Sequence, residues 1–288
     1  MTNPASSPMP SESTPSPEPA VPAAEKPSHA GPIAVIKIGG STLGQNDTSL
    51  ADIVALYHKG VRPVIVHGGG KVITEWMDRQ GIRARFVRGL RVTDAASLDI
   101  VVAVLTGLVN KQLVNSLNAL GAPCVGISGV DGGILRAEIQ DPELGFVGRV
   151  VKVNTAPIQG ILSAGLIPVI APVAVAAASE PGKAAQLLNV NADVAAGEIA
   201  GAMSASRLVM LTDVEGVLDT SKRLIPRLTG RQARELMESG IAGGGMVPKL
   251  EACLAAVASV GETHIIDGRR PGALLETFEG HARGTRIG

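Results

Sequence analysis

The sequence predicts an α/β protein whose sheet is mainly parallel and flanked by helices. Short apolar runs rich in β-branched residues alternate with helical segments from residue 33 onward. This alternation is typical of parallel strands, because each parallel pair needs a crossover connection. Hydrophobic residues make up 45% of the 288 residues and aromatics only 2%, which suits layers of small aliphatic side chains on a sheet. The 35 glycines suit many tight turns between strands and helices.

Taken in chain order, the expected strands are short and buried. They span residues 33–38, 63–67, 123–127, 167–170, 207–211 and 264–266. The expected helices span residues 50–60, 72–79, 98–120, 156–164, 191–200 and 252–260. Asp94 before the longest helix and Gly121 after it are typical helix boundaries. Two further segments, 131–153 and 181–190, are expected to be hairpins inserted between these units.

Residues 1–31 have a different composition from the rest of the chain. They combine Ser, Ala and Glu with Pro4, Pro8, Pro10, Pro15, Pro17, Pro19, Pro22 and Pro27, and they contain no aromatic residue. Such a segment buries too little apolar surface to offset its ordering entropy. It also lacks the features of a secretory signal or a mitochondrial presequence. We expect a disordered extension on a cytoplasmic protein.

Composition argues against several classes of function. Basic and acidic residues both number 26, so no overall field attracts nucleic acid, and few aromatics are available to stack on bases. The two cysteines, Cys124 and Cys253, lack metal-ligand spacing and are interpreted as buried hydrophobic residues. The longest apolar stretch, 161–178, is no membrane span, because it is broken by Gly165, Pro168 and Pro172.

Two expected strands end in glycine clusters that lead toward helices. The clusters are Lys37-Ile38-Gly39-Gly40-Ser41 and His67-Gly68-Gly69-Gly70-Lys71. At the carboxyl end of a parallel strand, glycine lets backbone N–H groups approach an anion closely. Neither cluster matches a Walker loop or a dinucleotide fingerprint. Tight turns made for packing alone would have the same appearance, but two such turns, one preceded by a lysine, favour an anion site.

Lys37 needs a partner, because burying an unpaired ammonium group costs several kcal/mol. A local structural aspartate or a bound anion would serve. Candidates to share its site are Asp193 in the first turn of a helix, Lys249 after a glycine loop, and Arg91 before the longest helix. Singly, each is compatible with a helix cap or a solvated charge. Together they predict a site that handles anions.

These stretches resemble the amino acid kinase family, and within it the acetylglutamate kinase branch. The resemblance spans residues 33–287 and rests on segments 37–41, 66–70, 89–93, 189–193, 212–217 and 244–249. It implies an open three-layer α/β/α sandwich with a mainly parallel central sheet, formed by residues 32–288. Residues 32–178 would be an N-lobe that binds the acyl amino acid, and residues 179–288 a C-lobe that binds ATP.

The resemblance also implies the reaction and its reactants. ATP, with Mg²⁺ carried by the nucleotide and no metal held by the protein, would phosphorylate the γ-carboxylate of N-acetyl-L-glutamate in arginine biosynthesis. A carboxylate is already a nucleophile at neutral pH, so no general base is needed. The difficulty is bringing one anion up to another, which calls for positioning and charge stabilisation. The absence of a catalytic His or Cys is therefore expected, and His67 is assigned a supporting or structural role.

The family's site residues carry over to matching positions of this chain. Gly69 and Gly70 would hold the reacting end of the substrate, Arg91 its α-carboxylate, and Asn189 its N-acetylated end. Lys37 and Lys249 would neutralise phosphoryl oxygens from two sides, with Asp193 orienting both lysines. The nucleotide would be lined by Gly39, Gly40, Asp213, Val214, Glu215, Gly216, Val217, Leu218, Ile241, Ala242 and Gly243.

Two rival functions use the same fold. A kinase for a carrier-protein-linked aminoadipate or glutamate would need a basic surface, for which the chain offers the run Arg79, Arg83, Arg85 and Arg88. A ligand sensor without catalysis would be expected to lose a lysine or the aspartate, and this chain keeps Lys37, Lys249 and Asp193.

The expected assembly is a homodimer with weak or no inhibition by arginine. His281-Ala282 stands where arginine-sensitive relatives are expected to carry Glu-Gly, and the proline-rich tail replaces an N-terminal helix. A PII-type regulator is possible but not indicated. No nucleic-acid or membrane partner is expected.

Overall fold

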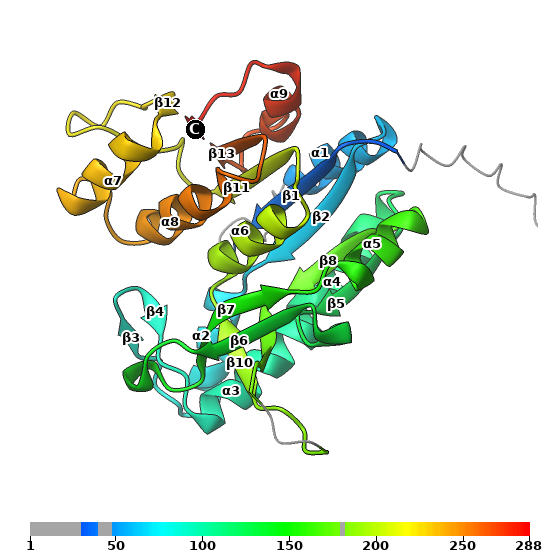
Figure 1. Ribbon diagram of the computed structural model, residues 1–288, viewed down its shortest axis with the longest axis vertical. Helices are drawn as coiled ribbons and strands as arrows, with labels where there is room; N and C mark the ends of the chain where they lie inside the picture. Colours follow the sequence, from blue (N-terminus) through cyan, green and yellow to red (C-terminus); the bar gives the residue numbers. More distant parts are fainter. Residues whose placement is uncertain (1–29, 40–47, 179–181) are drawn as a thin grey trace, which may run out of the picture.

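A central sheet organises the molecule, which is described here by a computed structural model over residues 30–39, 48–178 and 182–288 (Figure 1). The strands of this sheet are β1 (Ile33–Ile38), β2 (Arg62–His67), β5 (Cys124–Ser128), β8 (Ile167–Ala171), β11 (Arg207–Thr212), β12 (Arg227–Leu228), β13 (Glu262–Asp267) and β14 (Thr285–Ile287). Their order is β12-β14-β13-β11-β1-β2-β8-β5. The strands from β13 to β5 are parallel, and β14 is antiparallel to β13.

A second, smaller β-structure lies beside the sheet. It consists of β6 (Leu135–Ile139), β7 (Val147–Val153), β9 (Val173–Ala176) and β10 (Leu187–Val190), which close into a barrel. The antiparallel pair β6–β7 confirms the first predicted hairpin. The second hairpin, β9–β10, begins earlier than expected, because the apolar stretch after Pro172 contains a strand of its own. A short hairpin, β3 (Phe86–Val87) with β4 (Leu90–Arg91), stands apart from both.

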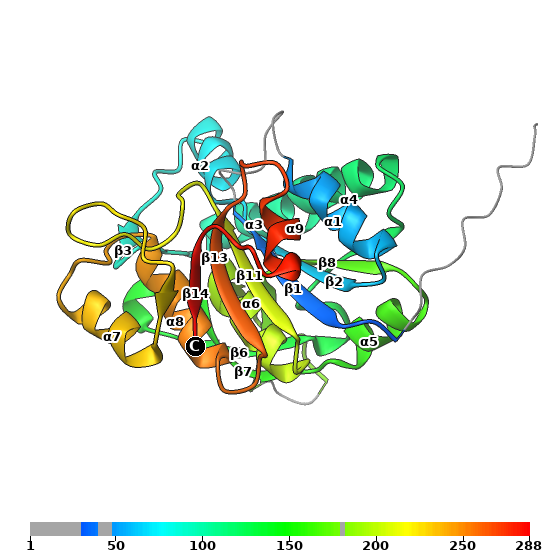
Figure 2. The same cartoon turned by 90° about the horizontal axis from the view of Figure 1, so that it is seen from above.

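Helices cover both faces of the central sheet (Figure 2). They are α1 (Ser49–His58), α2 (Gly70–Arg79), α3 (Ala95–Val102), α4 (Asn110–Ala119), α5 (Ala156–Ser163), α6 (Ala192–Ala202), α7 (Gly230–Glu238), α8 (Met246–Ala256) and α9 (Ala273–Glu279). Short 3-10 turns, η2 (Asp131–Gly133) and η3 (Pro142–Leu144), flank β6. In Figure 2, α6 and α8 lie on one side of the sheet, and α1, α4 and α9 on the other. The predicted mainly parallel α/β sandwich is thus confirmed.

The long helix contains an irregular middle. Between α3 and α4, residues Ala103–Val109 form a π-helix, η1, so that the helical stretch runs without interruption from Ala95 to Ala119. By length and composition alone this stretch could cross a membrane, and half of its most apolar window is buried inside the molecule. A buried core helix of a soluble protein passes the same test. The stretch 161–178 is divided among α5, β8 and β9.

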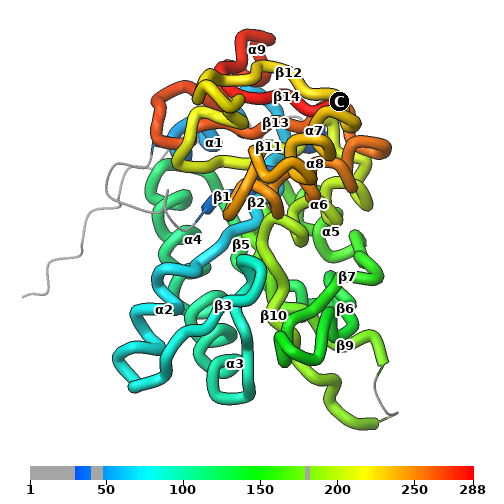
Figure 3. The backbone as a smooth tube through the Cα atoms, turned by 90° about the vertical axis from the view of Figure 1, so that its left-hand side faces the viewer, coloured from blue at the N-terminus to red at the C-terminus, as the bar shows by residue number. Residues whose placement is uncertain are grey.

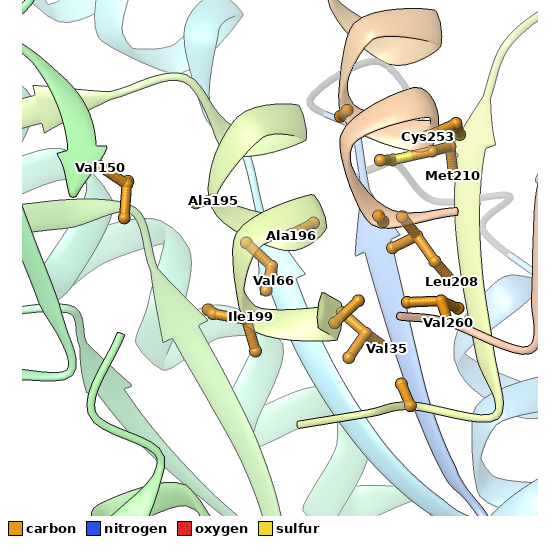
Figure 4. Packing of buried hydrophobic residues seen from close by; sticks show 14 of the residues in the cluster. Val35, Val66, Val150, Ala195, Ala196, Ile199, Leu208, Met210, Cys253 and Val260 are labelled. Carbon is orange, nitrogen blue, oxygen red and sulfur yellow. The ribbon is translucent and has the colours of Figure 1, made fainter. Parts of the chain in front are cut away.

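Alternate residues of β1 face different parts of the core, as the period of a strand requires. Ala34, Ile36 and Ile38 belong to the cluster under α1 and α4, while Val35 belongs to the cluster under α6. Figure 4 shows this second cluster, with labelled residues Val35, Val66, Val150, Ala195, Ala196, Ile199, Leu208, Met210, Cys253 and Val260. Lys37 shares the parity of Val35 and therefore faces α6.

Most predicted strands and helices are confirmed; the β3–β4 hairpin and the π-helical η1 were not predicted, and the remaining errors lie near the C-terminus. Helices α7 and α9 and strands β12 and β14 were not predicted. Helix α8 begins at Met246 rather than at residue 252, because Pro248 is tolerated in the first turn of a helix. Apart from Ala30 and Gly31, the proposed disordered extension lies outside the described residues, and so does Gly40.

Strands β1 and β2 separate two groups of elements (Figure 3). In that view, α7, α8, α9 and the C-terminal strands lie above them, and α2, α3, the β3–β4 hairpin and the barrel lie below. The predicted lobe boundary between residues 178 and 179 stays a prediction. Just beyond it, β10 pairs with β7 and β9 of the barrel.

Candidate active site

Asp193 lies between two lysines. Its Oδ1 is 2.9 Å from the Nζ of Lys37, and its Oδ2 is 3.2 Å from the Nζ of Lys249. Lys249 also donates to the carbonyl oxygen of Gly245 at 3.3 Å. The side chains of Lys37, Asp193 and Lys249 are 7%, 8% and 14% exposed. One buried carboxylate therefore holds two ammonium groups in fixed positions.

Three elements bring these side chains together. Lys37 is near the carboxyl end of β1, on the face covered by α6. Asp193 lies in the first turn of α6, where the side chain of Asn191 caps the helix by accepting from the Asp193 and Val194 N–H groups. Lys249 lies in the first turn of α8.

Helices α6 and α8 bring Asp193 and Lys249 together because they pack closely. A Cβ at Gly197 of α6 would lie only 2.8 Å from the carbonyl oxygen of Ala252 in α8. Glycine at this position therefore allows the middles of the two helices to approach closely.

The local charge is positive, since two ammonium groups face one carboxylate. Burial lowers the pKa of Lys37, Asp193 opposes that shift, and Lys249 adds to it. Burial alone would raise the pKa of Asp193, but the two lysines outweigh it and lower the pKa below its usual value. An anion placed beside the lysines would stabilise their charged forms. The group is therefore suited to receive a negatively charged ligand.

A glycine turn supplies backbone donors beside this group. Gly69 and Gly70 connect β2 to α2, and neither N–H donates to an acceptor within the part of the chain that the structure describes. The N-terminal end of α2 adds its partial positive charge there. A Cβ at Gly69 would lie 2.7 Å from Cδ2 of Leu105, whereas one at Gly70 would meet open space. Gly69 is required by packing, and Gly70 borders the cavity.

Arg91 is buried and held by neutral groups. It donates to the carbonyl oxygen of Gly70 and to Oγ1 of Thr74, each at 2.8 Å, and contacts Sδ of Met77 at 3.2 Å. Its guanidinium lies 4.8 Å from the ring centroid of Phe86. Burial lowers its pKa, partly opposed by Asp78, and within the described ranges it makes no ion pair. A ligand carboxylate would supply the missing countercharge.

A cleft of about 220 Å³ joins these groups. Its lining includes the predicted residues Lys37, Gly69, Gly70, Arg91, Asn189 and Asp193. Asn189 is fixed by donating from Nδ2 to Oγ1 of Thr93 at 3.1 Å. Lys249 does not line this cleft and is connected to it through Asp193. The structure thus gathers the predicted catalytic and substrate residues at one place, while their individual roles stay predictions.

The predicted nucleotide residues divide into exposed and buried ones. Asp213, Val214, Glu215, Ile241 and Gly243 are exposed, whereas Gly216, Val217 and Ala242 are buried and Leu218 is intermediate. Asp213 follows β11, next to β1 in the sheet, and favours the charged form of Lys37.

Packing accounts for the buried members of this set. Gly216 has a φ of 148°, and a Cβ there would lie 2.7 Å from Leu224 and from Thr285. The N–H of Val217 donates to Oγ1 of Thr285 at 2.8 Å. The side chains of Val217 and Ala242 belong to the same buried cluster, so they would support a nucleotide site from below rather than contact the ligand directly.

Several cleft residues were given no individual role from the sequence. Among them are Gly68, Phe86, Leu105 and Asn191. Asn191 was detectable, because an Asn before a helical run is a cap signal. Phe86 and Leu105 gave no local signal, since their places depend on the β3–β4 hairpin and on η1.

Comparisons with known proteins agree with this geometry. Residues 32–267 match the amino acid kinase family. An acetylglutamate kinase of Dehalococcoides mccartyi is 45% identical over 257 residues, covering 89% of this chain and 94% of that protein. An acetylglutamate kinase of Synechococcus elongatus is 47% identical over 267 residues, covering 90% of this chain and 87% of that protein.

A solved structure shares the fold at lower sequence identity. The N-acetylglutamate synthase of Neisseria gonorrhoeae, complexed with coenzyme A and N-acetyl-glutamate, aligns with a TM-score of 0.76 at 28% identity. The alignment covers 89% of this chain and 59% of that chain.

Proposed function

Because this chain belongs to the amino acid kinase family, we propose that it transfers the γ-phosphoryl group of ATP to the γ-carboxylate of N-acetyl-L-glutamate. The product would be N-acetylglutamyl 5-phosphate, an intermediate of arginine biosynthesis. The observation that carries the proposal is the pair of lysines held by Asp193 at a cleft that also contains Arg91 and the glycine turn. This arrangement offers separate positive positions for a phosphoryl group and for a carboxylate.

The chemical step requires charge stabilisation more than proton transfer. A γ-carboxylate oxygen forms a bond to the γ-phosphorus, the bond from that phosphorus to the bridging oxygen breaks, and ADP leaves. Lys37 and Lys249 would neutralise the equatorial phosphoryl oxygens, where charge accumulates in the transition state. The N–H groups of Gly69 and Gly70 would hold the reacting carboxylate. No side chain needs to gain or lose a proton.

The rest of the substrate would be recognised by Arg91 and Asn189. Arg91 has a fixed guanidinium and makes no ion pair among the described residues, which suits it to the α-carboxylate. The side-chain amide of Asn189 would bind the N-acetyl end. Together they would require both a free α-carboxylate and an acylated nitrogen.

ATP would be bound beyond the carboxyl end of β11, by Gly39, Gly40 and the segments Asp213–Leu218 and Ile241–Gly243. Mg²⁺ would be carried by the nucleotide and would neutralise its phosphate oxygens. Among the described residues, no group of three or more His, Cys, Asp or Glu could hold a metal ion. Asp193, the acidic group nearest the reaction, is already engaged by two lysines.

The two rival functions are less well supported. In the basic run proposed for a carrier protein, Arg88 pairs with Asp141 at 2.6 Å, and Arg79 lies 5.6 Å from the ring centroid of Trp76. The ligand-sensor alternative is weakened because Lys37, Asp193 and Lys249 form a complete charged group.

The remaining features are further proposals. We propose a cytoplasmic homodimer with weak or no arginine inhibition and without nucleic-acid or membrane partners. Light scattering with and without arginine tests the homodimer, and an activity titration with arginine tests the weak inhibition. A hexamer inhibited by sub-millimolar arginine would overturn both.

A coupled assay of ADP release tests the proposed reaction. N-acetyl-L-glutamate, L-glutamate, L-aspartate and L-2-aminoadipate are compared as acceptors at fixed ATP and Mg²⁺. N-acetyl-L-glutamate should give by far the highest kcat/KM. A higher kcat/KM for any unacetylated acceptor would overturn the substrate assignment.

A further inference from the structure

His67 is the last residue of β2, and its ring is fully buried beneath the glycine turn. Its Nδ1 lies 3.0 Å from the carbonyl oxygen of Gly68, and its Nε2 lies 3.1 Å from Nδ2 of Asn110. Asn110 is the first residue of α4, immediately after η1, and it is fully buried too. The π-helical segment thus places the polar side chain of Asn110 next to the ring of His67, directly under the cleft.

The carbonyl partners of Asn110 determine which atom of its amide faces His67. Its Nδ2 donates to the carbonyl oxygen of Val169 at 2.9 Å and lies 3.3 Å from that of Ile127. Its Oδ1 accepts from Nζ of Lys111 at 3.0 Å. Carbonyl oxygens only accept, so the amide NH₂ must face β5 and β8, and the same NH₂ faces His67.

The tautomer of His67 follows from this orientation. Because Nε2 accepts from Asn110, it carries no proton, and the ring proton must be on Nδ1. That Nδ1–H then donates to the Gly68 carbonyl. The ring is neutral in this arrangement, in agreement with its burial, which lowers the pKa of His67 to about 4.

Holding the Gly68 carbonyl also fixes the Gly69 N–H. The two groups belong to one planar trans peptide unit, in which C=O and N–H point in opposite directions. The other side of the turn is fixed as well, since the Gly68 N–H donates to the carbonyl oxygen of Ile38 at 2.9 Å. Because the Gly68 carbonyl points toward His67, the N–H of Gly69 in the same peptide unit points away from the ring.

We infer that His67 is a positioning residue for the reaction: with its tautomer set by Asn110, it orients the Gly69 N–H toward the substrate in the cleft. The inference rests on the proposed function, because Gly69 is there assigned to the reacting carboxylate. His67 itself is not among the residues that line the cleft, so it would act through the Gly68–Gly69 peptide. A purely structural role for a buried histidine is the competing explanation.

Two amide substitutions separate these explanations. In His67→Asn, the side-chain nitrogen occupies the place of Nδ1 and keeps the donor to Gly68, but the contact to Asn110 is lost. In His67→Gln, the amide reaches the place of Nε2 and keeps the contact to Asn110, but the donor to Gly68 is lost. Each variant retains one of the two buried contacts, so each serves as the control for the other.

We expect kcat to separate the variants where melting temperature does not. His67→Gln should lower kcat on the order of tenfold or more, a part of the 10²–10³-fold effect of losing one such donor. His67→Asn should keep most of the wild-type kcat, and KM for ATP should change little in either. If both variants lost kcat equally, and also lost melting temperature equally, the role of His67 would be structural and the inference would be overturned.

Nuclear magnetic resonance tests the same geometry without catalysis. In protein labelled with ¹⁵N-histidine, the His67 signal, identified by its loss in His67→Asn, should report the Nδ1–H tautomer at neutral pH. In protein labelled with ¹⁵N-glycine, the Gly69 amide signal should move in His67→Gln and stay in place in His67→Asn. An Nε2–H ring, or a Gly69 signal that moves equally in both variants, would overturn the inference. A different result would reject the proposed function alone. In that case the expected tautomer and Gly69 shifts would be seen, but the wild-type protein would phosphorylate no acceptor.

Discussion

The Nζ of Lys37 lies 2.9 Å from Oδ1 of Asp193, with both side chains buried. This contact joins the central strand β1 to the first turn of α6, and through Oδ2 of Asp193 it extends to Lys249 on α8. The three elements therefore present two cations at one place with a single compensating carboxylate. A site of this kind binds an anion at low reorganisation cost, because its charges are already held in position.

Removing either lysine should reduce the chemical step. We expect Lys37→Ala and Lys249→Ala each to lower kcat by about 10²–10³, the usual effect of losing one stabilising group. Steady-state kinetics on folded variants measures this. Lys59→Ala, which removes a half-exposed lysine paired with Glu279, is the matched control and should keep the wild-type kcat. If either active-site variant kept a near-wild-type kcat, the lysine replaced in it would have no part in the chemical step.

Arg91 should not be replaceable by lysine. A lysine would lose the bidentate geometry and the stacking on Phe86, so Arg91→Lys should raise KM for N-acetyl-L-glutamate with little change in KM for ATP. Arg88→Lys on the same hairpin, where the arginine is exposed, should leave both constants unchanged. A change in KM for ATP alone would show that Arg91 has been assigned to the wrong ligand.

The two glycines of the turn should respond differently to alanine. Gly69→Ala places a methyl group against Leu105, so it should lower both the melting temperature and kcat. Gly70→Ala meets open space and lies in the first turn of a helix, so it should keep the melting temperature and change only the kinetics of the acceptor. Calorimetry of the two variants decides this, and an equal loss of melting temperature would contradict the packing described at Gly69.

His67 should make the protein less stable in mild acid. Its pKa is lowered from 6.5 to about 4 in the folded state, mainly by burial, so between these values the unfolded chain binds more protons. Stability should therefore fall as pH decreases from about 6.5 to about 4, by up to about 3 kcal/mol. Denaturant unfolding against pH should show a smaller fall in His67→Asn. Identical pH profiles would mean that His67 titrates normally.

The sequence predicts the parts of the site that depend on local chemistry. Gly69, Gly70 and Lys37 lie at strand ends, where parallel topology brings glycine turns to one edge of the sheet. The position of Asp193 could be predicted because it lies in the first turn of α6, just after the residue that caps this helix. These positions required only the strand–helix alternation and the resemblance to the family.

The remaining parts depend on contacts between distant segments. The position of Asn110 under His67 is set by the π-helical η1, which no local pattern indicated. The approach of Lys249 to Asp193 depends on the packing of α8 on Gly197. Likewise, the burial of Val217 and Ala242 follows from the unpredicted strand β14 and helix α7, so the predicted nucleotide residues could not be divided into exposed and buried ones in advance.

Detection of the acyl phosphate itself tests the proposed reaction most directly. With γ-³²P-labelled ATP and N-acetyl-L-glutamate, the wild-type protein should transfer label to a product that hydroxylamine converts to the hydroxamate. L-glutamate should give far less labelled product under the same conditions. Release of labelled phosphate without a hydroxylamine-sensitive product, or equal labelling of L-glutamate, would contradict the assignment of the cleft to an acylated amino-acid substrate.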